Sequence, residues 1–172
     1  ACRMRVRTYM NLLLDLVGPV ARVWARMDNL AHPGVPVEDT TLALLEYANG
    51  ARGVLQASTA MYPGTDLRIE INGSKGTAVL VGDRLETFAF DPERAEDADA
   101  LAIGKAGGAT GAGGAAAFQY HEHQYLIEDL CDAIRADRDP RVTGREARKT
   151  LELALAMYDS AESGQWVELG GS

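Results

Sequence analysis

The sequence predicts an α+β domain, with an open, mainly antiparallel β-sheet and helices packed on one face. Residues 40–90 read as consecutive short strands separated by turn residues, with no helical pattern between them. One amphipathic helical pattern precedes this stretch and two follow it. Strands joined by short turns pair antiparallel. Because no helix connects one strand to the next, the helices are expected to gather on one face of the sheet.

The first helical pattern lies in the segment RTYMNLLLDLVG, where the apolar residues follow the i, i+3, i+4, i+7 spacing. Gly18-Pro19 is expected to end this helix. Residues 1–7, ACRMRVR, show no capping residue and are expected to form a tail. From Val20, apolar residues alternate with Arg and Asp, which predicts a strand with one solvated face.

The central stretch predicts a hairpin and then a meander. Thr40–Ala48 and Arg52–Thr59 are joined by Asn49-Gly50, a pair typical of a type I′ turn because both central residues then need positive φ. Pro63-Gly64 turns the chain into further predicted strands, in the segments DLRIEING, AVLVGD and RLETFAF.

The stretch Asp91 to Gly114 is expected to be a flexible loop. Its glycine cluster, GKAGGATGAGG, has no strand ahead of it and no Lys-Ser/Thr behind it, so a nucleotide-binding loop is not predicted.

Two helices and a short strand are expected to close the chain. The first helix has an apolar stripe made of Leu126, Ile127, Leu130, Cys131 and Ile134. The second begins with a capping box, Thr143 and Glu146, and ends at Gly164. Its buried face is predicted to consist of Ala147, Leu151, Ala154, Leu155 and Tyr158. The terminal segment WVEL is expected to return to the sheet edge.

Composition limits the classes of function. With 172 residues, 47% hydrophobic and 24% charged, the chain 1–172 reads as one globular domain with a proper core. A net charge of −8 opposes a nucleic-acid surface, which needs clustered basic residues. No apolar run predicts a membrane span or signal peptide. Cys2 and Cys131 suit a reduced, cytoplasmic setting, with Cys131 expected in core packing rather than as a nucleophile.

The order of several motifs carries a resemblance to a known family. They run as LxGPV, VEDT, NGARG, IxGSKGT, a histidine before EDLxxAI, and TGREARKTLELALAMYDSAESG. Over about Tyr9 to Leu169 the chain resembles the C-terminal half of the Gfo/Idh/MocA oxidoreductases, which include glucose-fructose oxidoreductase and inositol dehydrogenase. The resemblance implies a dihydrodipicolinate-reductase-like C-terminal domain.

The resemblance also implies a function for the longer protein. Family members join a Rossmann domain, which holds NAD or NADP, to a domain of this kind, and they pass hydride to or from a sugar-like or cyclitol-like alcohol. The C-terminal sheet lines the substrate site and often forms the oligomer interface. This sequence has no strand-GxGxxG-helix unit and no Glu-Lys-Pro motif, so no cofactor is expected in this chain. The Rossmann domain is expected to be missing or on another chain.

The family's catalytic pattern is altered at the front of the chain. The resemblance places an Asp, a His and a second Asp at the positions of Met4, Thr8 and Asn11. Threonine cannot act as a base near neutral pH, but Thr8 and Asn11 are able to hydrogen-bond a polyol. The arginine-rich start suggests that the chain begins beyond the natural domain boundary, by truncation or a shifted reading frame.

Two further residues are candidates for substrate contact. His123 lies where relatives have a histidine close to the substrate cleft, with proton transfer as its possible catalytic role; local bonding at a helix start is the alternative. Tyr62 lies in a predicted loop, where it is a candidate for contact with substrate or with a partner subunit. The alternative is an ordinary aromatic residue of a turn.

Two other groupings have simpler explanations. His121, Glu122, His123 and Asp129 suggest a metal, but residues two apart on a helix point away from each other, so none is predicted. Glu38 and Asp39 are either an acid/base pair or the start of a strand, and the strand start is favoured.

The uncovered face of the sheet is expected to drive self-association. Its predicted residues are Leu42, Leu44, Val54, Gln56, Ile69, Ile71, Val79 and Val81. The sequence thus predicts the substrate-binding and oligomerisation domain of a dehydrogenase, inactive alone. One alternative is a non-enzymatic dimerisation or ligand-binding module derived from such an enzyme, and a metal-dependent lyase is a third.

Overall fold

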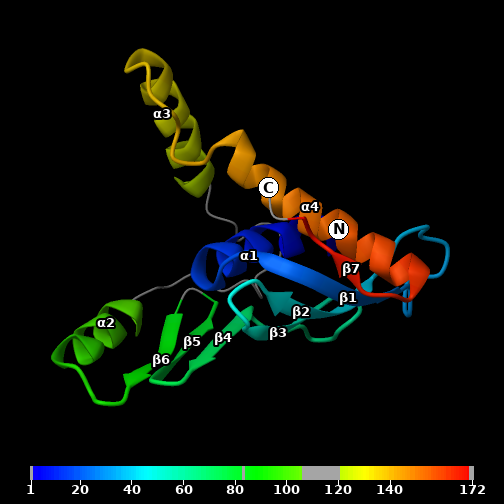
Figure 1. The fold of residues 1–172 in the computed structure, drawn as a ribbon, viewed down its shortest axis with the longest axis horizontal. Helices are drawn as coiled ribbons and strands as arrows, with labels where there is room; N and C mark the ends of the chain where they lie inside the picture. The colour runs from blue at the N-terminus through cyan, green and yellow to red at the C-terminus, as the bar shows by residue number, and fades with distance from the viewer. Residues whose placement is uncertain (1, 83, 106–120, 171–172) are drawn as a thin grey trace. The chain divides into compact units, whose positions relative to one another are not determined.

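The computed structural model describes the backbone of residues 2–82, 84–105 and 121–170, and the side chains of residues 10–82, 84–102 and 124–170. The chain divides into two compact units, one made of Ala1–Tyr62 with Glu128–Ser172 and the other of Pro63–Ile127. The elements shown in Figure 1 are α1 (Cys2–Val17), β1 (Val20–Asp28), β2 (Thr40–Tyr47), β3 (Arg52–Ser58), β4 (Arg68–Gly73), β5 (Gly76–Val81), β6 (Arg84–Phe90), α2 (Ala95–Lys105), α3 (His121–Arg135), α4 (Gly144–Ser163) and β7 (Val167–Glu168).

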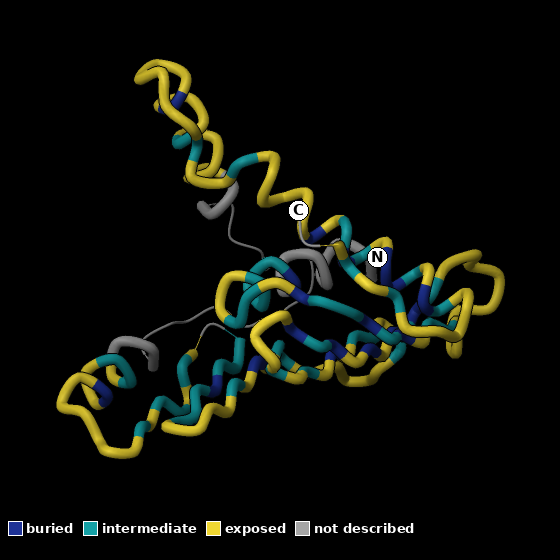
Figure 2. Tube along the Cα trace, viewed as in Figure 1, coloured by how far each residue is buried: buried dark blue, intermediate teal, exposed yellow. Residues whose placement is uncertain are grey.

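The first unit is an antiparallel sheet covered on one face by helices. Its strands lie in the order β3-β2-β1-β7. Alternate residues of the strands are buried (Figure 2) and pack against α1 and α4, as the period of two in a strand requires. The buried core consists of Met10, Val20, Val23, Ala25, Ala43, Leu45, Tyr47, Leu55, Leu153, Ala156 and Met157.

The antiparallel α+β class is confirmed, and so are several of its details. β7 returns to the sheet edge beside β1. The capping box of Thr143 and Glu146 is formed in both directions at the start of α4. Gly164 ends that helix with φ 69° and donates its N–H to the Ser160 carbonyl.

The predicted hairpin forms, but its turn type differs. β2 and β3 pair in continuous register from Thr40↔Ser58 to Glu46↔Arg52. Gly50 has φ 91° and donates to the Tyr47 carbonyl, whereas Asn49 is not in the positive-φ region. The connection is therefore a type I turn followed by a glycine bulge, and not the type I′ turn expected.

The first helix starts earlier than expected. α1 runs from Cys2, so the backbone of residues 2–7 is helical and the predicted tail is wrong. Arginine and methionine have good helix propensity, which makes a capping residue dispensable there. The helix ends as predicted, where Gly18 adopts φ 111° and donates to the Leu14 carbonyl.

The second unit is a separate sheet with its own helix. Its strands lie in the order β4-β5-β6, and α2 packs on β6. The single meander expected is thus divided between two sheets, with no ladder between β3 and β4 in the described part of the chain. α2 replaces the start of the loop predicted from Asp91, because its alanines favour a helix and Arg94 donates its backbone N–H to Asp97 at the N-terminus. The glycine cluster begins in Gly104 and lies mainly outside the described residues.

The buried faces of the last two helices were predicted incorrectly. Along residues 124–135, only Ala133 is buried. The predicted α3 stripe is exposed, and Cys131 is exposed with it rather than in the core. In α4, Leu151 and Leu155 are exposed, while Thr150, Leu153, Ala156, Met157 and Ser160 are buried. The helix carries two stripes that contain apolar residues. The stripe that includes Thr150 and Ser160 faces the sheet, and the stripe of Leu151 and Leu155 faces solvent.

Candidate functional site

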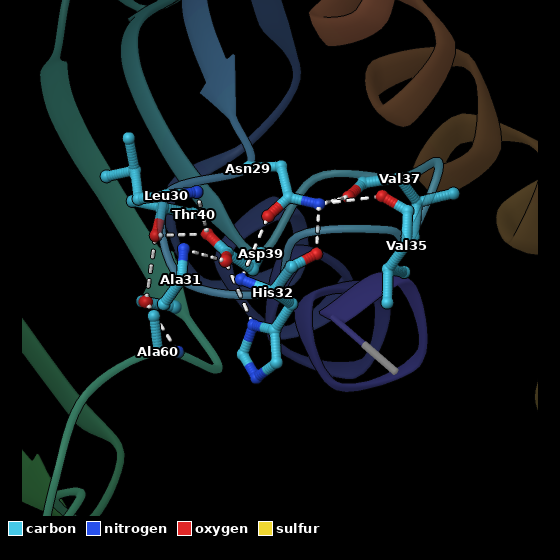
Figure 3. A network of polar contacts seen from close by, with 10 residues as sticks. Asn29, Leu30, Ala31, His32, Val35, Val37, Asp39, Thr40 and Ala60 are labelled. Atoms are coloured by element: carbon cyan, nitrogen blue, oxygen red, sulfur yellow. Dashed lines mark hydrogen bonds and ion pairs between the residues drawn. The ribbon is translucent and has the colours of Figure 1, made fainter.

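A network of hydrogen bonds converges on the carboxylate of Asp39, just before β2. It accepts hydrogen bonds from the backbone N–H groups of Leu30 and Ala31 at 3.0 and 2.8 Å. His32 Nδ1 lies 2.9 Å from the same carboxylate, and Thr40 Oγ1 donates to it at 3.0 Å. Figure 3 shows how these groups converge from the loop that joins β1 to β2.

A second amide fixes the rest of this loop. The Asn29 side chain donates to the carbonyls of His32, Val35 and Val37 at 3.0, 2.7 and 3.1 Å (Figure 3). Its Oδ1 accepts from the His32 backbone N–H. The proline-rich and glycine-rich loop therefore has a defined shape, because Asn29 and Asp39 satisfy backbone groups that no strand partner reaches.

These contacts decide the role of Asp39. The hydrogen bond from the Leu30 N–H, helped by those from Ala31, His32 and Thr40, lowers the pKa of Asp39 far below its usual range, although burial opposes the shift. A carboxylate held ionised in this way cannot serve as a general acid or base near neutral pH. Asp39 is 3% exposed and acts as a structural anchor.

Glu38 belongs to a different contact. Its Oε1 accepts a hydrogen bond of 2.6 Å from the Tyr158 hydroxyl of α4. Neighbouring residues of an extended segment point to opposite sides, which separates the Glu38 contact from the Asp39 network. The acid/base pairing of Glu38 with Asp39 is therefore not formed, and both carboxylates tie the β1–β2 loop to its surroundings.

Asn11 lies where α1 meets α4. Its Oδ1 accepts a hydrogen bond of 3.2 Å from Thr150 Oγ1. Thr150 is 7% exposed, whereas Asn11 is half-buried. Of the two sequence-predicted substrate residues whose side chains are described, Asn11 and Tyr62, Asn11 is the one with a hydrogen-bond partner.

For two of the other predicted substrate residues the structure describes the backbone alone. Thr8 lies on the helical backbone of α1, and His123 lies in the first turn of α3, but both side chains fall outside the described ones. Tyr62 lies in the loop after β3 and is 97% exposed. The roles of Thr8, Asn11, His123 and Tyr62 remain predictions.

The outer face of the first sheet presents an apolar row between charged residues. Trp24, Leu44 and Val54 lie in register across β1, β2 and β3. Leu44 and Val54 are 43% and 75% exposed. Beside them, Arg22 and Arg52 both pair with Glu46, at 2.6 and 3.2 Å.

Opposite charges lie next to one another in the row of Arg22, Glu46 and Arg52. The hydrogen bond from Arg22 lowers the pKa of Glu46, and Arg52 adds to the effect. Arg22 also stacks on the Trp166 ring, 4.9 Å from its centroid. Leu42 and Gln56 extend the exposed face as predicted, but Ile69 and Val79 are buried in the second unit and do not contribute.

Metal ligands do not gather among the described side chains, where no group of three His, Cys, Asp or Glu residues is placed to hold an ion. Asp129 instead pairs with Arg138 Nη2 at 2.8 Å and accepts the Arg141 backbone N–H at 2.7 Å. No helix in the described part of the chain is long and apolar enough to cross a membrane.

Comparison with known proteins shows which family part of the chain resembles. Residues 9–79 match the model described as the GFO/IDH/MocA C-terminal domain. Over these residues the chain is similar to a GFO/IDH/MocA C-terminal domain. The matched region holds the part of α1 from Tyr9 onward, β1, β2, β3, β4 and most of β5. The match therefore includes Asn11, the Asp39 network and the outer apolar row.

Curated relatives share this domain over nearly the whole chain. D-apiose dehydrogenase of Rhizobium rhizogenes is 27% identical over 164 residues, covering 90% of this chain and 44% of that protein. D-apiose dehydrogenase of Paraburkholderia graminis is 29% identical over 159 residues, covering 90% and 40%. The chain thus spans less than half the length of these relatives.

Solved structures agree with the fold. The WlbA dehydrogenase from Bordetella pertussis, in complex with NADH and UDP-GlcNAcA, has a TM-score of 0.79 and 28% identity, covering 98% of this chain and 47% of that one. Levoglucosan dehydrogenase in complex with NADH and levoglucosan has a TM-score of 0.73; at 21% identity it supports the fold alone. This chain covers about half the length of each of these two structures, 47% and 49%.

Several contacts of the candidate site were not predicted from the sequence. His32 and Thr150 were not singled out, and Tyr158 was predicted only as a core residue. Thr150 sits inside a helical run where a hydroxyl gives no distinct signal, and its partner is 139 residues away in sequence. The local signal for the Asp39 anchor was its place in the VEDT motif. An aspartate directly after an irregular loop can accept hydrogen bonds from the N–H groups of that loop.

Proposed function

We propose that this chain is the substrate-binding and oligomerisation domain of an NAD(P)-dependent dehydrogenase that acts on a sugar-like or cyclitol-like alcohol. The observation that carries the proposal is the match to the GFO/IDH/MocA C-terminal domain, supported by two D-apiose dehydrogenases that align with 90% of the chain. The WlbA dehydrogenase, at 28% identity, was solved with NADH and a nucleotide sugar, which favours a nicotinamide cofactor and a sugar substrate.

The chain itself would bind the sugar and not the cofactor. Its sequence has no GxGxxG unit after a strand, the motif that holds a dinucleotide pyrophosphate. A carbon that gives up hydride has to be held against the nicotinamide, so redox chemistry requires a Rossmann domain beside this one. In that arrangement Thr8, Asn11 and Tyr62 would bind the sugar, and His123 would either bind it or transfer its hydroxyl proton.

The outer sheet face supports the oligomerisation part of the proposal. Trp24, Leu44 and Val54 form an apolar row that α1 and α4 do not cover in the described part of the first unit. In the charged row beside it, Arg22 and Arg52 are matched by Glu46 and by Glu168, which lies 4.0 Å from Arg22. A second copy of the same face would bury the apolar row without leaving a net charge unpaired.

A non-enzymatic dimerisation or ligand-binding module is the second candidate. It is favoured by Met4 and Thr8, which stand at the positions that carry Asp and His in the family's catalytic pattern. Such a module would bind a polyol in the absence of NAD(P).

The deciding experiment measures the mass of the protein expressed from its native locus and its reduction of NAD⁺ or NADP⁺ with D-apiose. We expect a subunit roughly twice the length of this chain and substrate-dependent NAD(P)H absorbance, with no reduction by the 172-residue chain alone. A native subunit of this length that reduces neither cofactor, with D-apiose or a panel of sugars and cyclitols, would rule out the dehydrogenase and leave the binding module.

A further inference from the structure

The hydrogen bond between Thr150 and Asn11 links a side chain of α4 to a side chain of α1. Thr150 Oγ1 donates to Asn11 Oδ1 at 3.2 Å. Thr150 lies on the buried face of α4 with Leu153 and Met157, and its residue is 7% exposed. Water therefore competes poorly for this bond, and breaking it would leave a buried hydroxyl without its partner.

The bond fixes the orientation of the Asn11 amide. A carboxamide has one acceptor oxygen and one NH₂ group with two donors. Since Oδ1 is taken by Thr150, Nδ2 has to point the other way. Among the residues whose side chains the structure describes, none accepts a hydrogen bond from Asn11 Nδ2, and Asn11 is half-buried rather than enclosed.

A threonine inside a helix has a simpler option, which makes this contact informative. Its hydroxyl commonly donates to the carbonyl four residues earlier in the same helix. Here the hydroxyl donates to Asn11 Oδ1 on another helix instead. An amide turned over would offer Thr150 only NH₂ donors, so the hydroxyl would have to accept from Asn11 and send its own hydrogen elsewhere. In the observed arrangement Oδ1 faces Thr150 and Nδ2 points away from it.

We propose that Thr150 is a positioning residue for sugar binding: it holds Asn11 so that Nδ2 donates to an oxygen acceptor of the substrate. This rests on the proposed function, which takes Asn11 as a substrate-binding residue. The ligand group facing Asn11 is then a hydroxyl, ether or carbonyl oxygen. Thr150 itself does not touch the substrate.

The test follows the Asn11 amide and sugar affinity in the same samples. The uniformly ¹⁵N-labelled 172-residue chain is titrated with D-apiose and, separately, with levoglucosan. Asn11→Asp identifies the Asn11 NH₂ signals by their loss. Thr150→Val and Thr150→Ala both remove the donor but differ in volume, and Thr150→Ser keeps the hydroxyl as the matched control.

We expect a sugar to shift the Asn11 NH₂ signals of the wild-type chain. Thr150→Val and Thr150→Ala should displace those signals before sugar is added and weaken binding about fivefold to tenfold, the effect of one neutral hydrogen bond. Thr150→Ser should restore both within about twofold, while the backbone amide spectrum of each variant reports an intact fold.

Each outcome bears on a different step. If sugar moves the Asn11 signals but both donor-less variants bind as tightly as wild type, the positioning role is overturned and the proposed function stands. If neither sugar moves the wild-type Asn11 signals although Thr150→Val displaces them, the hydrogen bond is real but the substrate role of Asn11 fails, and the positioning proposal fails with it.

Discussion

The backbone N–H of Ala25 donates to Ser160 Oγ at 2.8 Å, so a serine of α4 supplies the acceptor that a neighbouring strand would otherwise provide. β7 pairs only with Arg22 and Val23, which leaves the next donor on that edge of β1 without a strand partner. Ser160 is fully buried, and its hydroxyl donates a hydrogen bond to the Gln165 carbonyl at 2.7 Å. One hydroxyl thereby satisfies two backbone groups and joins α4, β1 and the turn before β7.

Replacing Ser160 by alanine is expected to destabilise the first unit by about 1–3 kcal/mol, because the buried Ala25 N–H and the Gln165 carbonyl both lose their partner. Urea unfolding followed by circular dichroism measures this. Ser163→Ala is the control on the same helix, because Ser163 Oγ bonds the Asp159 carbonyl at an exposed position. Equal losses for the two variants would show that the buried bridge contributes nothing special.

The Asp39 carboxylate should make stability depend on acid. Its pKa is lowered in the folded state, so its contribution is fully present above the unfolded pKa of about 4 and is lost as the pH falls through the folded pKa. We expect the urea midpoint of the wild-type chain to drop between about pH 5 and about pH 2. Asp39→Asn should lower the midpoint near neutral pH and flatten this acid limb.

Asp15→Asn, at an exposed position of α1, is the matched control and should keep the wild-type acid limb. Amide spectra add a local reading, since Leu30 and Ala31 lose their carboxylate acceptor in Asp39→Asn. An unchanged acid limb in Asp39→Asn would mean that other carboxylates cause the acid sensitivity.

The two glycines that bound α4 should respond in opposite directions to alanine. Gly164 has φ 69°, a conformation that costs an L-residue about 1–2 kcal/mol, so Gly164→Ala should destabilise by that amount. Gly144 starts the helix without positive φ and with open space at its Cβ, so Gly144→Ala should be neutral or stabilise by up to about 1 kcal/mol. Thermal unfolding of the two variants tests the pair, and a loss at Gly144 would contradict the expectation.

Local rules predicted most of the elements because the residues that decide them are close in sequence. The Asn49-Gly50 hairpin, the Thr143–Glu146 box and the Gly164 cap are each set within a few residues, and all three elements formed. The turn type was wrong because a glycine at the αL position suits both the expected turn and the observed bulge.

Long-range choices could not be read in the same way. α4 has two apolar stripes, and the sheet receives the one with Leu153 and Met157, because Ser160 and Thr150 on that side satisfy Ala25 and Asn11. Hydrophobicity alone favoured Leu151 and Leu155. For the candidate site, sequence alone predicted Asn11 but not the Thr150 partner that orients it.

The exposed row on the outer face of the first sheet gives the last prediction. Leu44 lies between Trp24 and Val54 in register, so a charge at Leu44 would be buried without a partner in any assembly that covers this face. Leu44→Asp should weaken self-association by a factor on the order of 10 to 100 while the chain stays folded, because central apolar contacts dominate interface energies. Analytical ultracentrifugation of the wild-type and variant chains measures this.

Leu155→Asp is the control, since Leu155 is 54% exposed but lies on α4, on the other side of the sheet. Dissociation by Leu155→Asp, with Leu44→Asp still assembled, would move the interface from the sheet to the helices.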